Sequence, residues 1–488
     1  MKEKITSLVS DLKAYWKKPK TDNYVSLREV AAFSVGGMGI KSIQSLNGYI
    51  TLAPTCLLVA SVYGLSPRNI MFLFIITNII GILKTPFVSM LVDNTHTKMG
   101  KFRPYIVWAG LPALVSTVIL TWGVPLDASA NVKMIIIGVF INILAIAQGL
   151  YGNAYTGISQ VITPNSAERT SILSISEFLA NLGPSIIQFI LPTMAGIFFG
   201  KDGMLDIRTY RVFFPLFGVC GFLIGLLTML GTRERVIDTG NEKEHISFFE
   251  GIKYISKNRY FWIVTISKFF EGFKGVIGSL LPWVCAYELG NSSVQGIVQT
   301  VVSVGFTPGI VLAPLIIKKL GSRYGAFTAH FLNCLAATVM LFTFRRGFVF
   351  FAISLFLYNF ASGPQYIMQT SILSDGFDFQ QDRDGVRIEG FAQNFMGMIT
   401  TIGGIVSTVV FTFIYESNGL IADAKTGLTD YSILVNSSIR EPIITSVILV
   451  VIAASFLSAV PYLFCNLTRR DMDEIRKSLE NKKSLKNS

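Results

Sequence analysis

Long runs of apolar residues recur along the whole 488-residue chain and constrain its fold more than any other feature. Hydrophobic residues make up 51% of the sequence and charged residues only 15%, too few for the surface of a water-soluble domain. The runs reach about 20 residues, the length with which a helix crosses roughly 30 Å of hydrocarbon. No short alternating segments of the transmembrane-barrel type occur. We therefore expect an all-α polytopic membrane protein.

Twelve membrane helices are expected, and the longest connection separates two groups of six. The N-terminus (residues 1–28) is basic and its spacing suits an amphipathic helix on the membrane surface, with a frayed tail as the alternative. The expected domains are therefore this N-terminus, an N-terminal half at 29–231, a cytoplasmic linker at 232–259, a C-terminal half at 260–466 and a basic cytoplasmic tail at 467–488. The expected helices are 29–60, 67–92, 104–124, 133–160, 170–198, 210–231, 260–287, 292–316, 324–344, 347–374, 388–415 and 441–466.

A short basic loop at 93–105, DNTHTKMGKFRPY, joins two of the apolar runs. Its clustered positive charges place it in the cytoplasm, and alternation then puts both termini there as well. The net charge is +12, and most of the basic residues lie in the expected cytoplasmic loops and termini. We therefore attribute the positive charge to orientation in the cell membrane and to attraction to anionic membrane lipids, and we expect no nucleic-acid partner. The five cysteines lie in apolar runs without metal-ligand spacing and predict no disulfide framework.

Two cytoplasmic loops carry motif residues. The first has Asp93, Thr95, Thr97, Lys98, Gly100, Lys101, Phe102, Arg103 and Pro104, and the second has Asp375, Gly385, Arg387, Glu389 and Gly390. In these residues the chain resembles the glycoside–pentoside–hexuronide:cation symporters, the melibiose-type branch of the major facilitator superfamily. The resemblance implies twelve helices in two pseudo-symmetric halves that rock around a midplane substrate site. It also implies gating by cytoplasmic charges, with simple topology anchors as the alternative: Asp93, Arg103, Arg169, Asp375 and Arg387.

Ionisable side chains at membrane depth are costly and are the first functional candidates. They are Lys41, Lys84, Glu177, Lys268, Glu271 and Lys274. The last three are spaced i, i+3 and i+6 on one predicted helix, so the carboxylate of Glu271 can bridge both lysines. For lysines near helix ends, the alternative is that the amine reaches the membrane interface.

The chain departs from the family at the cation site. The carboxylates that sodium-coupled members carry fall at Lys41, Gly81, Thr85 and Gly152, and an arginine of the family falls near Glu177. We expect Lys41 and Glu177 to form an inverted ion pair, and sodium coupling through the family site is not expected. Two mechanisms remain open, namely proton coupling through Glu177 or Glu271, and uncoupled transport or exchange.

The buried lysines outnumber the buried carboxylates, which favours an anionic substrate such as a hexuronide. Lys41 would hold it together with Lys274 or Lys268, and a neutral sugar is the alternative. Aromatic and polar side chains add candidate substrate contacts, for which interhelical packing is the alternative: Tyr151, Asn153, Tyr155, Thr156, Gln365, Trp283 and Asn394.

These features predict a monomeric secondary transporter of a small-molecule sugar or glycoside. A carrier of lipids or other organic anions and a transporter-like sensor are the competing classes. No nucleophile–base pair or metal constellation is present in the sequence, so we expect neither an enzyme nor a cofactor or metal site.

Overall fold

The structure is a computed structural model that describes residues 15–19, 23–95, 97–235, 248–386 and 388–466, together with 471–478 except 473 and 476. Nearly all of these residues are helical and none of them forms a strand, which confirms the all-α expectation. Within these described ranges, ten helical spans are long and apolar enough to cross a membrane. Most of the predicted N-terminal amphipathic helix and basic tail lies outside the described residues.

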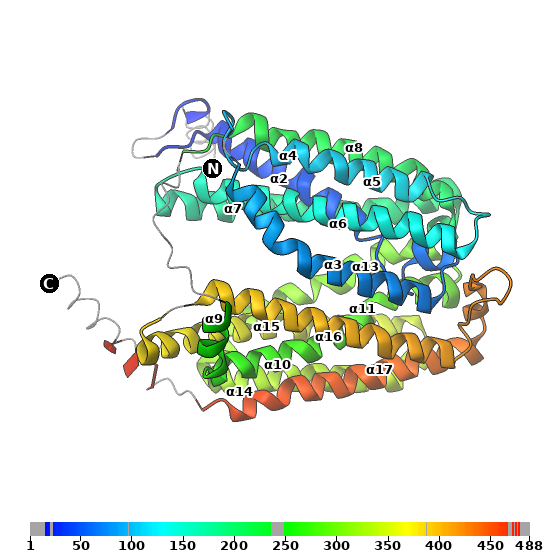
Figure 1. Ribbon diagram of the computed structural model, residues 1–488. Coiled ribbons are helices and arrows are strands. Elements are labelled where there is room, and N and C mark those ends of the chain that lie inside the picture. The colour runs from blue at the N-terminus through cyan, green and yellow to red at the C-terminus, as the bar shows by residue number, and fades with distance from the viewer. Residues whose placement is uncertain are drawn as a thin grey trace, which may run out of the picture. The chain divides into compact units, whose positions relative to one another are not determined.

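The chain forms two compact units, each built from packed helices (Figure 1). Unit 1 comprises residues 1–241 with two short segments, 292–296 and 422–431; unit 2 comprises 242–291, 297–421 and 432–488. The segment 422–431 packs on unit 1 because Thr429 N–H donates to the carbonyl of Gly64 (2.8 Å) and the Tyr431 hydroxyl to that of Leu65 (2.8 Å).

In unit 1 the helices pack around α2, which contacts α6, α7 and α8. The bounds are α2 Leu27–Asn47, η1 Leu57–Val62, α3 Pro67–Asp93, α4 Tyr105–Trp108, α5 Gly110–Trp122, α6 Ala130–Val161, α7 Ser166–Phe199, η2 Gly203–Leu205 and α8 Ile207–Gly231.

In unit 2 the central element is α10, which contacts α15, α16 and α17. The bounds are α9 Phe248–Ser256, α10 Arg259–Lys274, α11 Val276–Ser279, α12 Leu281–Trp283, η3 Val284–Glu288, η4 Ser292–Val294, α13 Gln295–Val304, α14 Phe306–Thr343, η5 Phe344–Arg346, α15 Phe348–Asp384, α16 Glu389–Ser417, η6 Tyr431–Val435, α17 Ser437–Ala459 and η7 Val460–Phe464. Of these, η4 and the first residues of α13 belong to unit 1.

All twelve predicted segments contain helix, but several differ from the expected form: the third breaks at Ala109 and the eighth at Gly305. The first breaks between α2 and η1, and the seventh breaks after Gly275 and again at Leu280, just before Pro282. The tenth runs on to Asp384 rather than ending at 374, because its polar extension stays helical until Gly385 (φ +72°) caps it in the left-handed conformation.

Glycines let α2 approach its neighbours closely. A Cβ on Gly36 would lie 2.1 Å from Thr228 Oγ1, and one on Gly39 would lie 2.5 Å from the carbonyl oxygen of Gly221. Both neighbours belong to α8, so these two positions of α2 admit only hydrogen as a side chain.

Another pair of glycines sets the position of α10 in unit 2. A Cβ on Gly272 would lie 3.1 Å from the carbonyl carbon of Gly403 in α16, and one on Gly403 would lie 2.6 Å from the carbonyl oxygen of Phe269. Because α16 lies this close on one side, the charged side chains of α10 are directed to the other helices that surround it.

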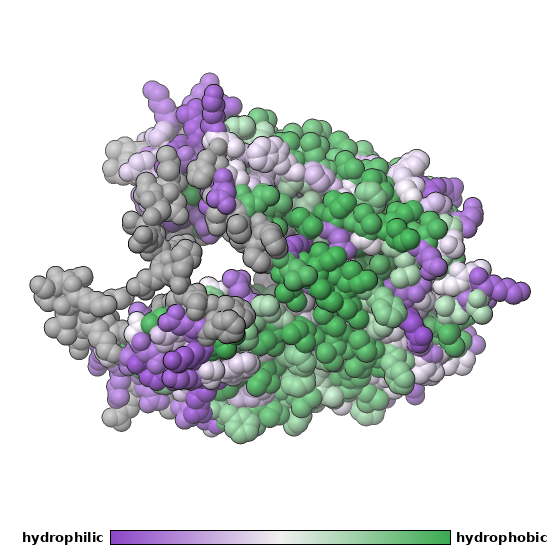
Figure 2. Space-filling view, in the orientation of Figure 1, coloured by the Kyte–Doolittle hydropathy of each residue, from purple (hydrophilic) through white to green (hydrophobic). Residues whose placement is uncertain are grey.

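Figure 2 shows apolar residues along the middle of the visible helices of each unit, with hydrophilic residues toward their ends.

Candidate functional site

Unit 1 holds one ion pair between ionisable residues that the sequence singles out. Lys41 Nζ on α2 lies 2.5 Å from Glu177 Oε2 on α7 and donates to Asn181 Oδ1 at 3.1 Å. The side chains are 21% and 48% exposed respectively, so the pair lies at the surface of unit 1. The predicted inverted pairing of these two residues is confirmed, and it leaves Lys41 charge-balanced.

Gly152 on α6, the position predicted for the family's helix 4 carboxylate, lies beside the side chain of Gln44. Gln44 Nε2 lies 2.7 Å from the position that a Cβ on Gly152 would take. Among the described residues, no group of three or more His, Cys, Asp or Glu side chains could hold a metal ion.

The polar and aromatic candidates on α6 fall into two groups. Tyr151 and Tyr155 are 0% and 4% exposed and belong to the core of unit 1, where Tyr155 stacks on Phe33 at 4.5 Å. Asn153 and Thr156 are exposed. The structure therefore makes the two tyrosines core residues, while Asn153 and Thr156 remain predicted substrate contacts.

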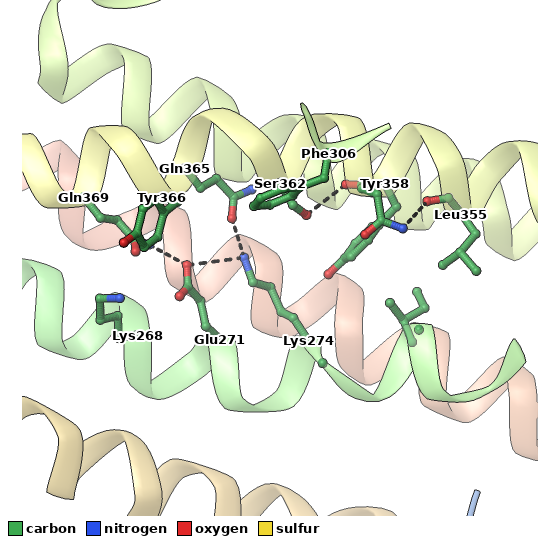
Figure 3. A pocket seen from close by; sticks show the side chains of 14 residues that line it. Lys268, Glu271, Lys274, Phe306, Leu355, Tyr358, Ser362, Gln365, Tyr366 and Gln369 are labelled. Atoms are coloured by element: carbon green, nitrogen blue, oxygen red, sulfur yellow. Dashed lines mark hydrogen bonds and ion pairs between the residues drawn. The ribbon is translucent and has the colours of Figure 1, made fainter. Parts of the chain in front are cut away.

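Unit 2 contains a cavity of about 350 Å³ between α10, α11, α14 and α15. Its volume lies in the range typical of a small-molecule site, and most of its lining residues carry a polar group. Figure 3 shows charged side chains of α10 directed toward amide side chains of α15. The lining residues are Lys268, Glu271, Lys274, Gly275, Ile277, Gly278, Phe306, Leu355, Tyr358, Asn359, Ser362, Gln365, Tyr366 and Gln369.

Lys274 is the most enclosed charge in this cavity, with its side chain 8% exposed. Its ammonium group donates to Gln365 Oε1 at 3.0 Å and lies 3.2 Å from His330 Nδ1. Glu271 Oε1, on the same helix face, lies 3.8 Å away and accepts a hydrogen bond from Gln369 Nε2 at 2.5 Å. The predicted contact between Glu271 and Lys274 is therefore confirmed, and Lys268 lines the same cavity.

His330 and Asn333 on α14 complete this network, and the sequence analysis missed both. His330 is completely buried, and its ring stacks on Tyr462 with centroids 5.2 Å apart. Asn333 bonds Gln365 and donates to the carbonyl of Tyr358 at 2.8 Å. An ionisable residue inside an apolar run was the available signal for His330.

Two further substrate candidates of unit 2 lie outside the cavity lining. Trp283 is 1% exposed and packs edge-on against Tyr415 with ring centroids 5.4 Å apart. Asn394 is exposed on α16. The structure makes Trp283 a core residue, while the role of Asn394 stays a prediction.

The candidate gating residues that the structure describes are tied to nearby backbone. Arg103 donates to the carbonyl of Met229 from Nε (2.9 Å) and Nη2 (2.5 Å), and Arg169 Nη2 donates to that of Thr163 at 2.9 Å. Asp375 lies on α15 and is half-buried. Arg387 and the side chain of Asp93 lie outside the described part of the chain, so the gating role stays a prediction.

Glu234, which follows α8, binds the basic loop in a way that the sequence analysis did not anticipate. Its carboxylate accepts the backbone N–H groups of Lys101 (2.7 Å), Phe102 (2.9 Å) and Arg103 (2.9 Å). Gly100 at φ +108° turns the loop so that these three donors converge.

The chain combines membrane-length helices with a cavity lined by charged and amide side chains, and solved structures share its fold. The nucleoside transporter NupG is 12% identical with a TM-score of 0.61, covering 90% of this chain and 98% of its own. A bacterial homologue of the iron transporter ferroportin, in its inward-facing state, is likewise 12% identical with a TM-score of 0.61, covering 90% and 99%. These two likenesses show that the chain shares the fold of both transporters.

The chain belongs to the family described as MFS/sugar transport protein, which matches residues 32–469. It is 24% identical to the isoprimeverose transporter of Lactiplantibacillus pentosus over 74% of this chain and 75% of that one. It is also 24% identical to the putative glycoside/cation symporter YagG of Escherichia coli K12, over 67% and 70%. These relatives confirm the predicted glycoside–pentoside–hexuronide symporter family.

Proposed function

We propose that the protein is a secondary transporter that carries an acidic sugar or glycoside of the hexuronide type by alternating access. The relatives named for isoprimeverose and for glycosides support a sugar substrate. The acidic character rests on the cavity of unit 2, where two lysines, Lys268 and Lys274, face a single carboxylate, Glu271. A substrate carboxylate would neutralise the extra positive charge, since an unpaired buried ammonium is costly.

The rest of the cavity suits a sugar ring. Asn359, Ser362 and Gln369 supply hydrogen-bonding groups, and Tyr366 and Phe306 supply aromatic surfaces for the apolar face of a ring. Glu177 already neutralises the charge of Lys41, so Lys41 does not need a substrate anion as its partner. We therefore propose Lys274 together with Lys268 as the anion site.

Coupling to protons, or transport without coupling, is proposed in place of sodium coupling. This proposal rests on the glycine at position 152, which offers no side-chain ligand where the resemblance predicts a carboxylate. We propose further that both termini are cytoplasmic and that the protein contacts anionic membrane lipids, because of the distribution of its basic residues. We also propose that the protein is a monomer in the cell membrane.

Counterflow into proteoliposomes tests the substrate class, with methyl β-D-glucuronide compared with methyl β-D-glucoside at several pH values, with and without sodium. The glucuronide should exchange, Lys274→Met should abolish exchange, and sodium should have no effect. The exposed Lys425 in segment 422–431 of unit 1 provides a control, since Lys425→Met should leave exchange unchanged. Exchange of the glucoside alone, unaffected by Lys274→Met, would contradict the proposal.

A neutral sugar is the second candidate. The relative named for isoprimeverose and the uncharged amides of the cavity favour it. In that case the glucoside should exchange as fast as the glucuronide, and Lys274 would serve only to order Gln365 through their 3.0 Å hydrogen bond.

A further inference from the structure

The ammonium group of Lys274 has three neighbouring acceptors that hold it unequally. Gln365 Oε1 at 3.0 Å and His330 Nδ1 at 3.2 Å lie within hydrogen-bonding distance. Glu271 Oε1 at 3.8 Å lies beyond it and acts on the ammonium through its charge alone. An ammonium group has three N–H donors, so the two neutral acceptors use two of them and the carboxylate faces the third.

The two neutral acceptors are fixed in the protein. His330 is 0% exposed and stacks on Tyr462, while Gln365 is 5% exposed and its Nε2 donates to the carbonyl of Ala329 at 3.1 Å. His330 Nε2 lies 3.2 Å from Gln369 Nε2, so the ring is enclosed between Lys274 on one side and Gln369 on the other. These contacts hold the ammonium at the cavity wall whether or not Glu271 is present.

Glu271 differs from them because its side chain is 25% exposed and lines the cavity. Gln369 Nε2 donates to it at 2.5 Å from α15, so the carboxyl group keeps a partner when it leaves Lys274 (Figure 3). The amide N–H of Gln369 can donate to Glu271 in both protonation states, because a protonated carboxyl group still has a carbonyl oxygen that accepts.

We propose that Glu271 is an exchangeable counter-ion of Lys274, so that an anionic substrate takes its place and Glu271 then binds a proton. The incoming anion brings one negative charge to Lys274. Glu271, no longer compensated by that lysine, forms an O–H bond with a proton from cavity water, and the total charge of the site is conserved. Each bound anion is thereby loaded with one proton. This inference rests on the proposed acidic substrate and selects Glu271 rather than Glu177 as the coupling residue.

The ionisable groups around Glu271 are compatible with this exchange. Its own helix offers Lys268 and Lys274, α14 offers His330, α15 offers Tyr358, and η7 offers Tyr462. The close contact of α16 with α10 is made by Gly403, and the buried residues of α17 from Ile443 to Ala459 are uncharged. Lys268 thus remains as the second cation for the substrate.

Calorimetric titration of the purified full chain with methyl β-D-glucuronide, in buffers of different ionisation enthalpy, counts the protons taken up on binding. We expect about one proton per bound glucuronide in the wild type. Glu271→Gln resembles the protonated carboxyl group, so it should still bind and the proton count should fall to about zero. Glu177→Gln, the matched control in unit 1, should keep the wild-type count.

The outcomes separate this inference from the proposed function. No glucuronide binding by the wild type overturns the acidic substrate, and this inference with it. Binding without proton uptake, or an unchanged count in Glu271→Gln, overturns the exchange and leaves the substrate class standing. If Glu271→Gln does not fold, infrared difference spectra of the wild type should show a new protonated-carboxyl band on adding glucuronide, and absence of that band overturns the exchange.

His330 acts here as a positioning residue, and its effect should differ from that of Glu271. His330→Gln removes the acceptor at Nδ1, so the glucuronide affinity should fall about tenfold. The proton count should stay at the wild-type value because Glu271 is intact. A changed proton count at wild-type affinity would contradict this role.

Discussion

Glu234→Gln tests how strongly one carboxylate holds the basic loop between α3 and α4. In the wild type Oε1 accepts two backbone N–H groups, from Phe102 and Arg103, and Oε2 accepts the third, from Lys101. The glutamine keeps an acceptor at one of these positions and places an amide N–H₂ at the other. At least one backbone donor then faces another donor and loses its partner.

The magnitude follows from the number of bonds lost. A hydrogen bond to a charged group contributes about 1.5–3 kcal/mol, and because the side chain of Glu234 is only half-buried the lower end applies. Glu234→Gln should therefore cost unit 1 about 2 kcal/mol of unfolding free energy, and Glu234→Ala, which loses all three bonds, about 4 kcal/mol. For a unit of this size, each kcal/mol corresponds to roughly 2–4 °C in Tm.

Thermal unfolding of the purified protein in detergent, followed by tryptophan fluorescence, measures both losses. Lys101→Ala is the matched control, because the carboxylate contacts the backbone N–H of Lys101 rather than its side chain. It should shift the Tm by less than either Glu234 variant. Equal Tm losses in Lys101→Ala and Glu234→Ala would refute the backbone-capture account and favour ordinary side-chain attraction.

Three further outcomes are expected from the geometry. Gly39→Ala should cost about 1–3 kcal/mol of unfolding free energy, since its Cβ would lie 2.5 Å from the carbonyl oxygen of Gly221; an unchanged melting temperature would contradict the close contact. Tyr155→Phe should leave both stability and sugar exchange unchanged, because the buried hydroxyl has no hydrogen-bond partner; lost exchange would restore Tyr155 as a substrate contact. Asp206 caps the N-terminus of α8, where its carboxylate accepts the backbone N–H of Arg208, and the Arg208 side chain lowers the pKa of this carboxyl group. The cap therefore stabilises α8 fully above the unfolded pKa of about 3.9, and this stabilisation is lost as the pH falls through the lower folded pKa. Asp206→Ala should therefore lower the melting temperature at pH 7 more than at pH 3, and equal losses at both would argue against it.

The helices and the candidate charges could be predicted from the sequence because each depends on local pattern. Apolar length defines a membrane helix, and ten of the twelve expected segments meet this criterion in the described part of the chain. The spacing of three residues brings Glu271 and Lys274 to one helix face, and it alone predicts their contact. The pairing of Lys41 with Glu177 could also be predicted, because two opposite charges at membrane depth need a partner.

The sequence could not show which side of a helix faces the core. Tyr151 and Asn153 are two residues apart on α6, yet one is fully buried and the other is exposed. Both are plausible sugar ligands by residue type. The rotation of α6 against α2 and α5 decides between them, and that rotation depends on how well the three helices fit together.

What the sequence determined by itself is the membrane fold, the family motifs and the ionisable residues of the apolar runs, of which only Lys274 among the six candidates is buried. Only the tertiary structure brought His330 to Lys274, 56 residues away, and Gln365 to the same ammonium, 91 residues away. It also brought the backbone N–H groups of residues 101–103 into hydrogen bonds with the carboxylate of Glu234. The physical reason is that local patterns fix each helix, whereas contacts between helices depend on the packing of whole surfaces, which no short stretch of sequence encodes.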